Sequence, residues 1–249
     1  MIVIAGFGFV GSAVFETAIK SIKQVAVVDP KIGKETIRDY PQAEGLIVCV
    51  PTPSTKHGYE IEYLEQVLDK CKVGLPILIK STISPRLIDE IEATWPQLDI
   101  TYSPEYLTER NAKEDFAKQK IAHMGGHNVA FWRDIYRQML PDCVVRECDP
   151  KSLVLSKMIK NAYLGTKVAF FNQVWEVCKN NNIDYNELIT IIKDDTRIGD
   201  THMQVPGFDK KRGYGGSCFP KDIDALLAMS HKVFSILEEV KDYNNSLRE

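Results

Sequence analysis

The first half of the chain alternates short apolar runs with stretches in which apolar residues recur at helical spacing. The apolar runs predict strands over residues 1–5, 24–29, 46–50, 76–80, 98–102 and 120–124. The helical spacing predicts helices over residues 10–20, 61–71, 85–95 and 130–140. Strands that alternate with helices are typical of a parallel sheet covered on both faces, because the helices form the crossover connections. We therefore expect an α/β fold whose first part is a Rossmann-type, doubly wound parallel sheet.

The pattern changes near Pro150. Asp149 suits a helix N-cap and Pro150 suits the first helical position. Apolar spacing then predicts one long helix over residues 153–179, another over 185–193 and helical structure again over 220–247. A loop rich in Gly, Lys and Arg separates the last two segments. The chain is expected to contain two domains, a Rossmann domain over residues 1–148 and an all-α helical domain over residues 149–249.

Composition and charge narrow the class of protein. The chain has 249 residues, of which 44% are hydrophobic and 26% charged, with a net charge of −3 and both signs interspersed. This balance is typical of a globular protein and disfavours nucleic-acid or membrane binding. The apolar start lacks the features of a signal peptide, and the six cysteines form no CxxC pair. We expect a cytoplasmic protein without a metal site.

A GxGxxG motif follows the first predicted strand. Gly6 permits a tight turn, Gly8 allows the backbone to approach a pyrophosphate, and Gly11 allows close packing of helix on strand. Asp29 ends the next predicted strand, where its carboxylate can accept hydrogen bonds from a ribose diol and would repel a 2′-phosphate. The motif predicts that the chain binds NAD rather than NADP. The alternative is a structural turn followed by a surface aspartate.

A glycine-rich loop delivers Cys218 to the start of a predicted helix. The run over residues 213–222 has the sequence GYGGSCFPKD. Thiolates are stabilised at helix N-termini and beside cations such as Lys221, where they become nucleophilic. Asp222 follows one helical turn later and can act on a water molecule or orient a partner group. The alternative is a buried free cysteine after a glycine turn.

This run resembles the catalytic-cysteine signature of the UDP-glucose/GDP-mannose dehydrogenase family. Further segments resemble the same family in the same order. They are the GFGFVG start, residues 50–53 (VPTP), residues 80–82 (KST), residues 103–107 (SPEYL), and Lys157 with Asn161. The resemblance covers nearly the whole chain. It implies a cytoplasmic oxidoreductase of polysaccharide biosynthesis that oxidises a nucleotide sugar with NAD.

The resemblance implies a four-electron oxidation, with UDP-glucose converted to UDP-glucuronate as the first expectation. Cys218 would attack the intermediate aldehyde to form a thiohemiacetal, whose oxidation gives a thioester that water hydrolyses. GDP-mannose or another nucleotide sugar is an alternative substrate. A further alternative is a catalytically weak, NAD-binding dimerisation module that acts with a partner chain.

The same resemblance implies roles for individual residues. Lys157 and Asn161 share one helical face and would stabilise an oxyanion, although a solvated face is the alternative. Glu105 would activate the hydrolytic water, which Asp222 and Thr82 would position. The expected cofactor contacts are Gly6, Gly8, Phe9, Val10, Gly11, Asp29, Thr52, Pro53, Thr82 and Lys221. The expected substrate contacts are Tyr106, Leu107, Lys157, Asn161, Arg197, Tyr214 and Gly215.

Two features of the sequence bear on whether the chain acts with a second subunit or with another chain. Residues 195–199 resemble the family's segment whose arginine reaches the neighbouring subunit, so Arg197 would bind substrate in trans within a homodimer formed by the helical domain. A surface arginine is the alternative. Compared with the family, we expect the chain to lack the C-terminal, nucleotide-binding domain. It would then bind substrate weakly, need a separate chain that supplies the domain, use a smaller substrate or be a fragment. Residues 210–212 (KKR) are expected to be solvated, or alternatively to meet the substrate pyrophosphate.

Overall fold

The structure, a computed structural model, describes residues 1–33, 35–55, 58–230 and 233–249. It divides into two compact units. Unit 1 comprises Met1–Pro53 with Tyr59–Lys157, and unit 2 comprises Ser54–Gly58 with Met158–Glu249. The long helix α6, Pro150–Asn180, runs from one unit into the other. The domain boundary expected between residues 148 and 149 therefore stays a prediction.

Unit 1 is built on a seven-stranded sheet with the order β2-β1-β3-β6-β7-β8-β9. The strands are β1 Ile2–Ala5, β2 Val25–Val28, β3 Gly45–Val48, β6 Pro76–Ile79, β7 Asp99–Tyr102, β8 Ile121–Gly126 and β9 Val144–Glu147. The first five pair in parallel. In β1, β3 and β6 the central residues are almost fully buried because helices cover both faces, which is why these three sequences are continuously apolar. The predicted Rossmann-type sheet is confirmed.

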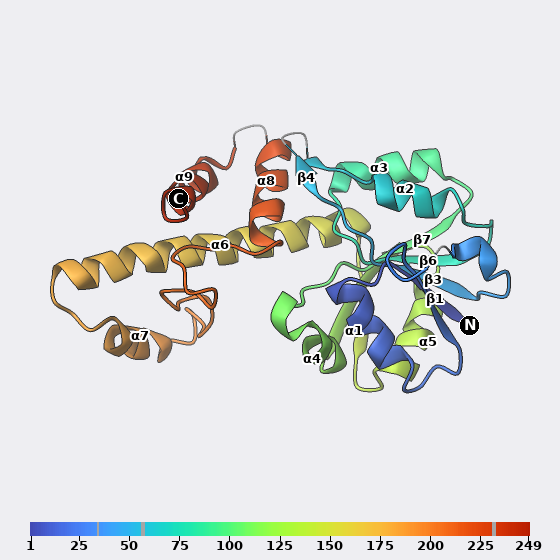
Figure 1. The fold of residues 1–249 in the computed structure, drawn as a ribbon, viewed down its shortest axis with the longest axis horizontal. Coiled ribbons are helices and arrows are strands. Elements are labelled where there is room, and N and C mark those ends of the chain that lie inside the picture. The colour runs from blue at the N-terminus through green and yellow to red at the C-terminus, as the bar shows by residue number, and fades with distance from the viewer. Residues whose placement is uncertain (34, 56–57, 231–232) are drawn as a thin grey trace. The chain divides into compact units, whose positions relative to one another are not determined.

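Helices cover both faces of this sheet (Figure 1). Those of unit 1 are α1 Phe9–Ala18, α2 Glu62–Leu68, α3 Pro85–Thr94, α4 Ala112–Ala117 and α5 Val129–Met139, with 3₁₀ turns at Ile37–Asp39 and Glu109–Asn111. Figure 1 shows α2 and α3 on one face and α1, α4 and α5 on the other. The second group buries Phe116, Trp132 and Tyr136 against β1 and β8, in one apolar cluster.

Two parts of the sheet differ from the sequence prediction. Strand β8 pairs with β7 in the antiparallel direction, through Gly125 and Gly126 opposite Tyr102 and Thr101. A Cβ at Gly126 would lie 2.5 Å from the carbonyl oxygen of Ile100, so the glycine permits this close pairing. Strand β9 was not predicted, because it is a largely exposed edge strand with charged residues in half of its positions.

Unit 2 consists of helices that follow the start of α6. They are α7 Tyr185–Lys193, α8 Phe219–Met229 and α9 Ser235–Ser246, beside a short pair of strands, β4 Ser54–Thr55 and β5 Gly58–Tyr59. The single helical segment predicted over residues 220–247 is thus two helices. Helix α6 continues through Gly165, where a Cβ would lie 2.7 Å from Cδ1 of Ile223 on α8. Glycine at this position lets α8 approach α6 closely (Figure 1).

Helix α6 begins as the sequence predicts. Its first residue is Pro150, and the carboxylate of Asp149 accepts a hydrogen bond from the Ser152 N–H at 2.7 Å. This bond satisfies one of the amide groups that a helix start leaves without a partner.

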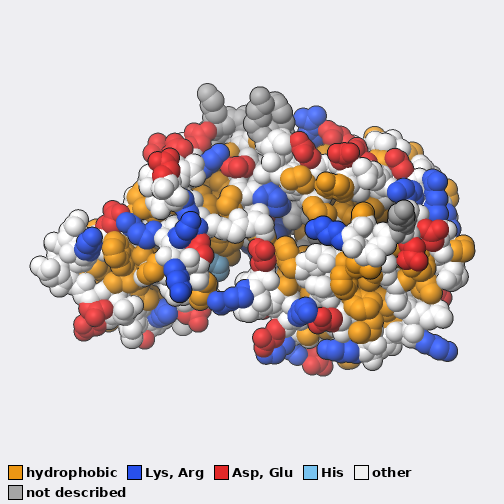
Figure 2. All heavy atoms as spheres, viewed as in Figure 1, with side chains coloured by type: hydrophobic (Ala, Val, Ile, Leu, Met, Phe, Trp, Pro, Cys, Tyr) orange, Lys and Arg blue, Asp and Glu red, His pale blue; other side chains and the backbone are white. Residues whose placement is uncertain are grey.

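The surface carries both signs of charge. Figure 2 shows acidic and basic side chains mixed over the visible face, as the interspersed sequence pattern indicates. Across the described ranges, no helix combines the length and apolar character needed to cross a bilayer.

Candidate active site

The glycine motif forms the turn between β1 and α1, and each glycine is required for a different reason. Gly6 has a φ of +90°, and a Cβ there would lie 2.7 Å from the carbonyl oxygen of Cys49. A Cβ on Gly11 would lie 2.0 Å from the carbonyl oxygen of Gly6. A Cβ on Gly8, in contrast, would meet no atom within 4 Å. Gly6 and Gly11 thus serve packing, whereas Gly8 keeps an open approach to the start of α1.

The open space beside Gly8, at the start of α1, suits a phosphate group. Gly8 is the N-cap of α1, and no side chain caps the helix. The uncapped N-terminus of a helix attracts anions through its amide groups and its dipole. Phe9 lines a cavity of about 240 Å³ beside the 3₁₀ turn at Glu109–Asn111. The turn and helix can therefore hold the pyrophosphate of a dinucleotide.

Asp29 follows β2 and points back at the glycine turn. Its carboxylate accepts hydrogen bonds from the Phe7 N–H at 2.6 Å and from the Lys31 N–H at 2.8 Å. Each oxygen has one such bond and retains acceptor capacity. The side chain is half-buried. The structure therefore fixes the orientation of this carboxylate next to the glycine turn.

Thr52 and Thr82 lie after neighbouring strands. The Thr52 hydroxyl donates to the carbonyl oxygen of Thr82 at 2.6 Å, and the Ser81 hydroxyl donates to that of Val50 at 2.7 Å. These bonds join the loops after β3 and β6 at the carboxyl edge of the sheet, where α/β folds bind ligands. Pro53, the next predicted cofactor contact, is exposed.

Glu105 lies after β7 and forms a buried ion pair with Lys80. The Lys80 ammonium also donates to the hydroxyl of Tyr136 at 2.6 Å and to the carbonyl oxygen of Ser103 at 3.2 Å. Burial disfavours the ammonium, but the charge of Glu105 and the bonds from Glu105 and Tyr136 together raise the pKa of Lys80. Lys80 is thus a charged partner of Glu105. The sequence analysis quoted it only as part of a motif.

Tyr106 and Lys157 lie together in unit 1. The Lys157 ammonium lies 5.4 Å from the centroid of the Tyr106 ring, and the Tyr106 hydroxyl bonds to that of Ser156 at 2.9 Å. Lys157 and Asn161, one turn apart on α6, are both only 6% exposed, so the alternative of a solvated helix face is wrong. Leu107 packs against the apolar cluster of unit 1.

Cys218 is the N-cap of α8, with a proline in the first turn, as the sequence predicts. Its side chain is half-buried, and its thiol lies 3.7 Å from the hydroxyl of Ser217. Two other cysteines have surroundings that disfavour a thiolate, since burial raises the pKa of both Cys49 and Cys71 to about 12.

Asp222 is buried one turn after Cys218 and joins two other predicted residues. Its carboxylate accepts a hydrogen bond from the Asn161 amide at 2.6 Å and forms an ion pair with Lys221 at 2.6 Å. The Asn161 amide has a second N–H, which this bond does not use. Within unit 2 the structure therefore brings Asn161 of α6 together with Lys221 and Asp222 in the first turn of α8, the helix that Cys218 begins.

Tyr214 and Gly215 lie in the loop before Cys218. Tyr214 is 5% exposed, and its main-chain N–H and carbonyl both bond to the side chain of Asn244. A Cβ on Gly215 would lie 2.5 Å from the guanidinium of Arg248. Sequence reasoning missed both Asn244 and Arg248, because neither lies in a motif.

Two arginines differ in exposure. The Arg197 side chain is 87% exposed and pairs with Asp195 at 2.5 Å. Arg212 was expected in a solvated loop, but it forms an ion pair with Glu176 at 2.5 Å and stacks on Trp175 at 4.8 Å. For Arg212 the solvated-loop prediction is wrong, since its guanidinium binds α6.

Over the described ranges, no three His, Cys, Asp or Glu residues are placed to hold a metal ion.

Comparison with known proteins identifies relatives of both parts of the chain. The NAD binding domain of the UDP-glucose/GDP-mannose dehydrogenase family matches residues 12–140, and the family's central domain matches residues 152–246. A UDP-glucose 6-dehydrogenase of Rickettsia typhi is 31% identical over 204 residues, which cover 76% of this chain and 45% of that protein. One of Bacillus subtilis is 25% identical over 94% of this chain and 56% of its own length. The chain thus spans about half the length of these relatives.

Solved structures share the fold. A UDP-glucose dehydrogenase from Pyrobaculum islandicum superimposes with a TM-score of 0.83 at 22% identity, over 98% of this chain and 68% of that one. A 3-hydroxyisobutyrate dehydrogenase from Mycobacterium tuberculosis superimposes with a TM-score of 0.78 at 16% identity, over 100% of this chain and 94% of that one. The family matches span most of both units, and the chain belongs to the UDP-glucose/GDP-mannose dehydrogenase family.

Proposed function

We propose that this chain takes part in the NAD-dependent oxidation of a nucleotide sugar, UDP-glucose to UDP-glucuronate, through a covalent adduct on Cys218. The position of Cys218 as N-cap of α8, one turn before the buried Asp222, is the observation that carries the proposal. Family membership and the names of the relatives support the substrate class. Substrate, activity and the roles below are proposals, because the chain spans about half of those relatives.

The residues of unit 1 suit NAD. The uncapped start of α1 would hold the pyrophosphate, and Asp29 would accept hydrogen bonds from the adenosine ribose. Phe9, Val10, Thr52, Pro53 and Thr82 are the remaining proposed cofactor contacts of unit 1, and Lys221 of unit 2 is proposed as a further contact. When bound, NAD supplies the acceptor for the hydride that leaves the sugar C6 in each oxidation.

Cys218 would hold the sugar between the two oxidations. Its thiolate adds to the C6 aldehyde, so that a C–S bond forms and the carbonyl π bond becomes an alkoxide. Loss of the C6 hydride from this thiohemiacetal gives a thioester. Water then adds to the thioester, the C–S bond breaks, and the carboxylate and the thiolate are released. Covalent capture keeps the reactive aldehyde from escaping.

Polar groups from both units are proposed to stabilise the charge that develops. Asn161, oriented by its bond to Asp222, has one N–H to donate to an oxyanion, and Lys157 would exchange a proton with the alcohol. Glu105 would accept a proton from the hydrolytic water, which Thr82 and Asp222 would position. Tyr106, Leu107, Tyr214 and Gly215 would contact the sugar.

We further propose a homodimer formed by the helical part, residues 149–249. Four large apolar side chains on α6, at spacings of four, seven and seven residues, are between 45% and 62% exposed, namely Ile159, Tyr163, Phe170 and Val177. Such a stripe along one helix favours association with a second copy. Arg197, exposed on its loop, would then reach the substrate of the partner subunit.

We further propose that a separate chain supplies binding groups for the nucleotide, because binding energy from a remote part of the substrate holds the sugar for reaction. We place the activity in the cytoplasm and in the supply of uronic acids for polysaccharides. The competing proposals are GDP-mannose as substrate and an NAD-binding dimerisation module without turnover.

The test is NADH formation with UDP-glucose, with GDP-mannose and without sugar. Two NADH per UDP-glucose support the double oxidation, and one NADH per sugar would point to a simple alcohol dehydrogenase. NAD binding without NADH formation would favour the dimerisation module. Cys218→Ser should stop steady-state turnover and leave NAD affinity unchanged. Normal turnover by this variant would overturn the covalent route.

A further inference from the structure

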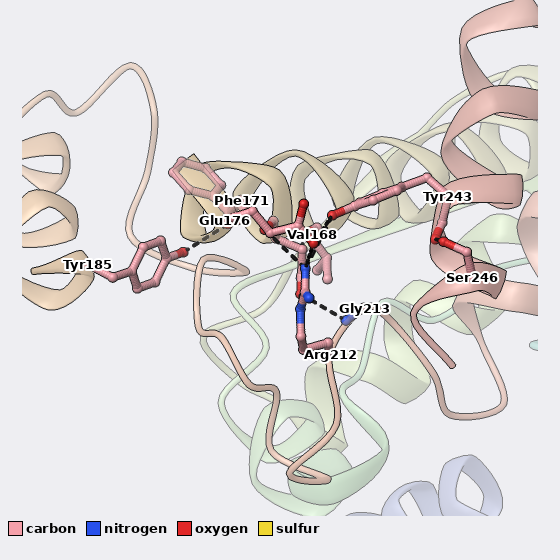
Figure 3. Close-up of polar contacts among 9 residues, drawn as sticks. Val168, Phe171, Glu176, Tyr185, Arg212, Gly213, Tyr243 and Ser246 are labelled. Carbon is pink, nitrogen blue, oxygen red and sulfur yellow. Dashed lines mark hydrogen bonds and ion pairs between the residues drawn. The ribbon is translucent and has the colours of Figure 1, made fainter. Parts of the chain in front are cut away.

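The loop that precedes Cys218 is held by polar contacts from two helices. The guanidinium of Arg212 donates to Glu176 of α6 at 2.5 Å and to the hydroxyl of Tyr243 of α9 at 3.3 Å (Figure 3). The next residue, Gly213, donates its N–H to the side-chain oxygen of Asn172 at 3.2 Å. These contacts therefore fix the position of Arg212 and Gly213, where the glycine-rich segment begins.

Asn244 of α9 makes the closest contact to the loop backbone. Its side-chain oxygen accepts the Tyr214 N–H at 2.7 Å, and its side-chain N–H donates to the Tyr214 carbonyl at 3.1 Å. Asn244 is 4% exposed, so water does not compete for these bonds. One carboxamide thus satisfies both polar groups of a buried peptide segment, as a neighbouring strand would.

Arg248, one turn after Asn244, completes the attachment. Its guanidinium donates to the Gly213 carbonyl at 2.8 Å and forms an ion pair with Asp209 at 2.5 Å. The same group packs on Gly215, where a Cβ would lie 2.5 Å from it. Residues 213–215 are therefore held by Asn244 on α9 and by Arg248 just after the end of that helix.

These contacts extend to the cysteine. The Tyr214 ring packs on Phe219, the residue after Cys218, with ring centroids 6.2 Å apart. Cys218 therefore lies between two residues that contact each other, and Asn244 fixes the backbone of the first. We propose that Asn244 is a positioning residue, which determines where the Cys218 thiol is held by fixing Tyr214. Its importance for turnover rests on the proposed function, but its effect on the loop does not.

Hydrogen exchange and thiol alkylation in the full chain test this without sugar or cofactor. Asn244→Ala removes both bonds to Tyr214. Asn244→Asp retains an acceptor for the Tyr214 N–H and loses the donor. Ser246→Ala is the matched control on α9, since among the described residues the Ser246 hydroxyl bonds to the carbonyl of Tyr243 in its own helix and not to the loop (Figure 3). N-ethylmaleimide modification of Cys218 and of the equally half-buried Cys71 is followed by peptide mapping.

In Asn244→Ala we expect the Tyr214 amide to exchange about tenfold faster or more, because it loses its acceptor. Alkylation of Cys218 should also become several-fold faster, because the loosened loop exposes the thiol, while the rate at Cys71 stays unchanged. Asn244→Asp should fall between Asn244→Ala and the unmodified chain, and Ser246→Ala should match the unmodified chain.

Unchanged exchange at Tyr214, or faster exchange with an unchanged alkylation rate at Cys218, would overturn the proposal. If Asn244→Ala unfolds unit 2, shown by alkylation of the buried Cys178 on α6, Asn244→Asp is judged by the same two criteria. A chain that behaves as expected but forms no NADH with any sugar would refute the proposed function and leave this inference standing.

Discussion

Lys80 and Glu105 form an ion pair in the interior of unit 1, where their side chains are 0% and 4% exposed. The pair lies after strands β6 and β7, with the ammonium 5.3 Å from the centroid of the Tyr136 ring. A buried charge is stable only when it is paired and hydrogen-bonded, and Lys80 has Glu105, Tyr136 and Ser103 as partners. The position of Glu105 at the sheet edge therefore depends on Lys80.

Lys80→Met should strongly destabilise the fold. The variant leaves the Glu105 carboxylate buried without its counter-charge, which costs about 3–5 kcal/mol of unfolding free energy. Tyr136→Phe removes one hydrogen bond to the ammonium and should cost about 1–3 kcal/mol. Urea denaturation measures both. Arg86→Ala, which breaks an exposed ion pair with Glu90, is the control and should change stability by less than about 0.5 kcal/mol. A Lys80→Met variant as stable as the control would contradict this account.

Substitutions at two glycines of the GxGxxG turn should affect NAD affinity and the free energy of unfolding differently. Gly8→Ala places its Cβ in open space, so we expect less than about 1 kcal/mol of destabilisation. The same methyl group occupies the approach to the helix start, so NAD affinity should fall about tenfold or more. Gly11→Ala collides with the Gly6 carbonyl and should lose about 1–3 kcal/mol or more of stability. Denaturation and NADH fluorescence titration measure the two effects. Equal NAD affinity in Gly8→Ala and the unmodified chain would show that the pyrophosphate binds elsewhere.

The sequence predicted the sheet well where burial is complete. Strands β1, β3 and β6 are continuously apolar because both faces are covered, and the turn at Gly6 follows from local backbone geometry. Strand β9 has no such pattern, since edge strands are exposed on one side. The direction of β8 depends on a distant pairing with β7, which local spacing does not encode.

In the candidate site too, the local motif could be predicted from the sequence and the distant contacts could not. Cys218 and Asp222 were recognised from one short motif in a defined helical context. Asn244 contacts the loop from a sequence distance of 30 residues, and Arg212 ties the loop to Glu176, which is 36 residues away. Asparagine and arginine are ordinary surface residues in a sequence. Their contribution is visible only in the folded chain.

Asp149 should make stability depend on pH below neutrality. Its bond to the Ser152 N–H lowers the pKa of the Asp149 carboxyl. A carboxyl with a lowered folded pKa contributes stability that is present above the unfolded pKa and is lost as pH falls through the folded pKa. Asp149→Ala should therefore lower the urea midpoint at pH 7, and the difference should shrink as the pH falls below about 4.

Asp149→Asn serves as the control for this prediction. Asparagine also caps a helix but carries no charge, so the stability difference between Asp149→Asn and Asp149→Ala should not vary with pH. A difference between Asp149→Ala and the unmodified chain that persists undiminished at pH 3 would mean that the carboxylate charge has no part in the cap.

Arg197 offers a test of the proposed dimer. Its side chain is 87% exposed and pairs only weakly with the nearby Asp195, because exposed ion pairs contribute little. If Arg197 serves the partner's site, Arg197→Ala and Cys218→Ser should each be nearly inactive in NADH formation. Mixing equal amounts and allowing subunit exchange should restore about a quarter of full activity. Half of the dimers are then mixed, and each mixed dimer has one complete site of two.

The matched control mixes Asp222→Asn with Cys218→Ser. Asp222 and Cys218 lie on the same helix of one subunit, so no mixed dimer contains a complete site and activity should not return. Recovery in the first mixture alone would place Arg197 in trans. If neither mixture recovers, although subunit exchange is verified by native mass spectrometry, Arg197 acts within its own subunit or is a surface residue.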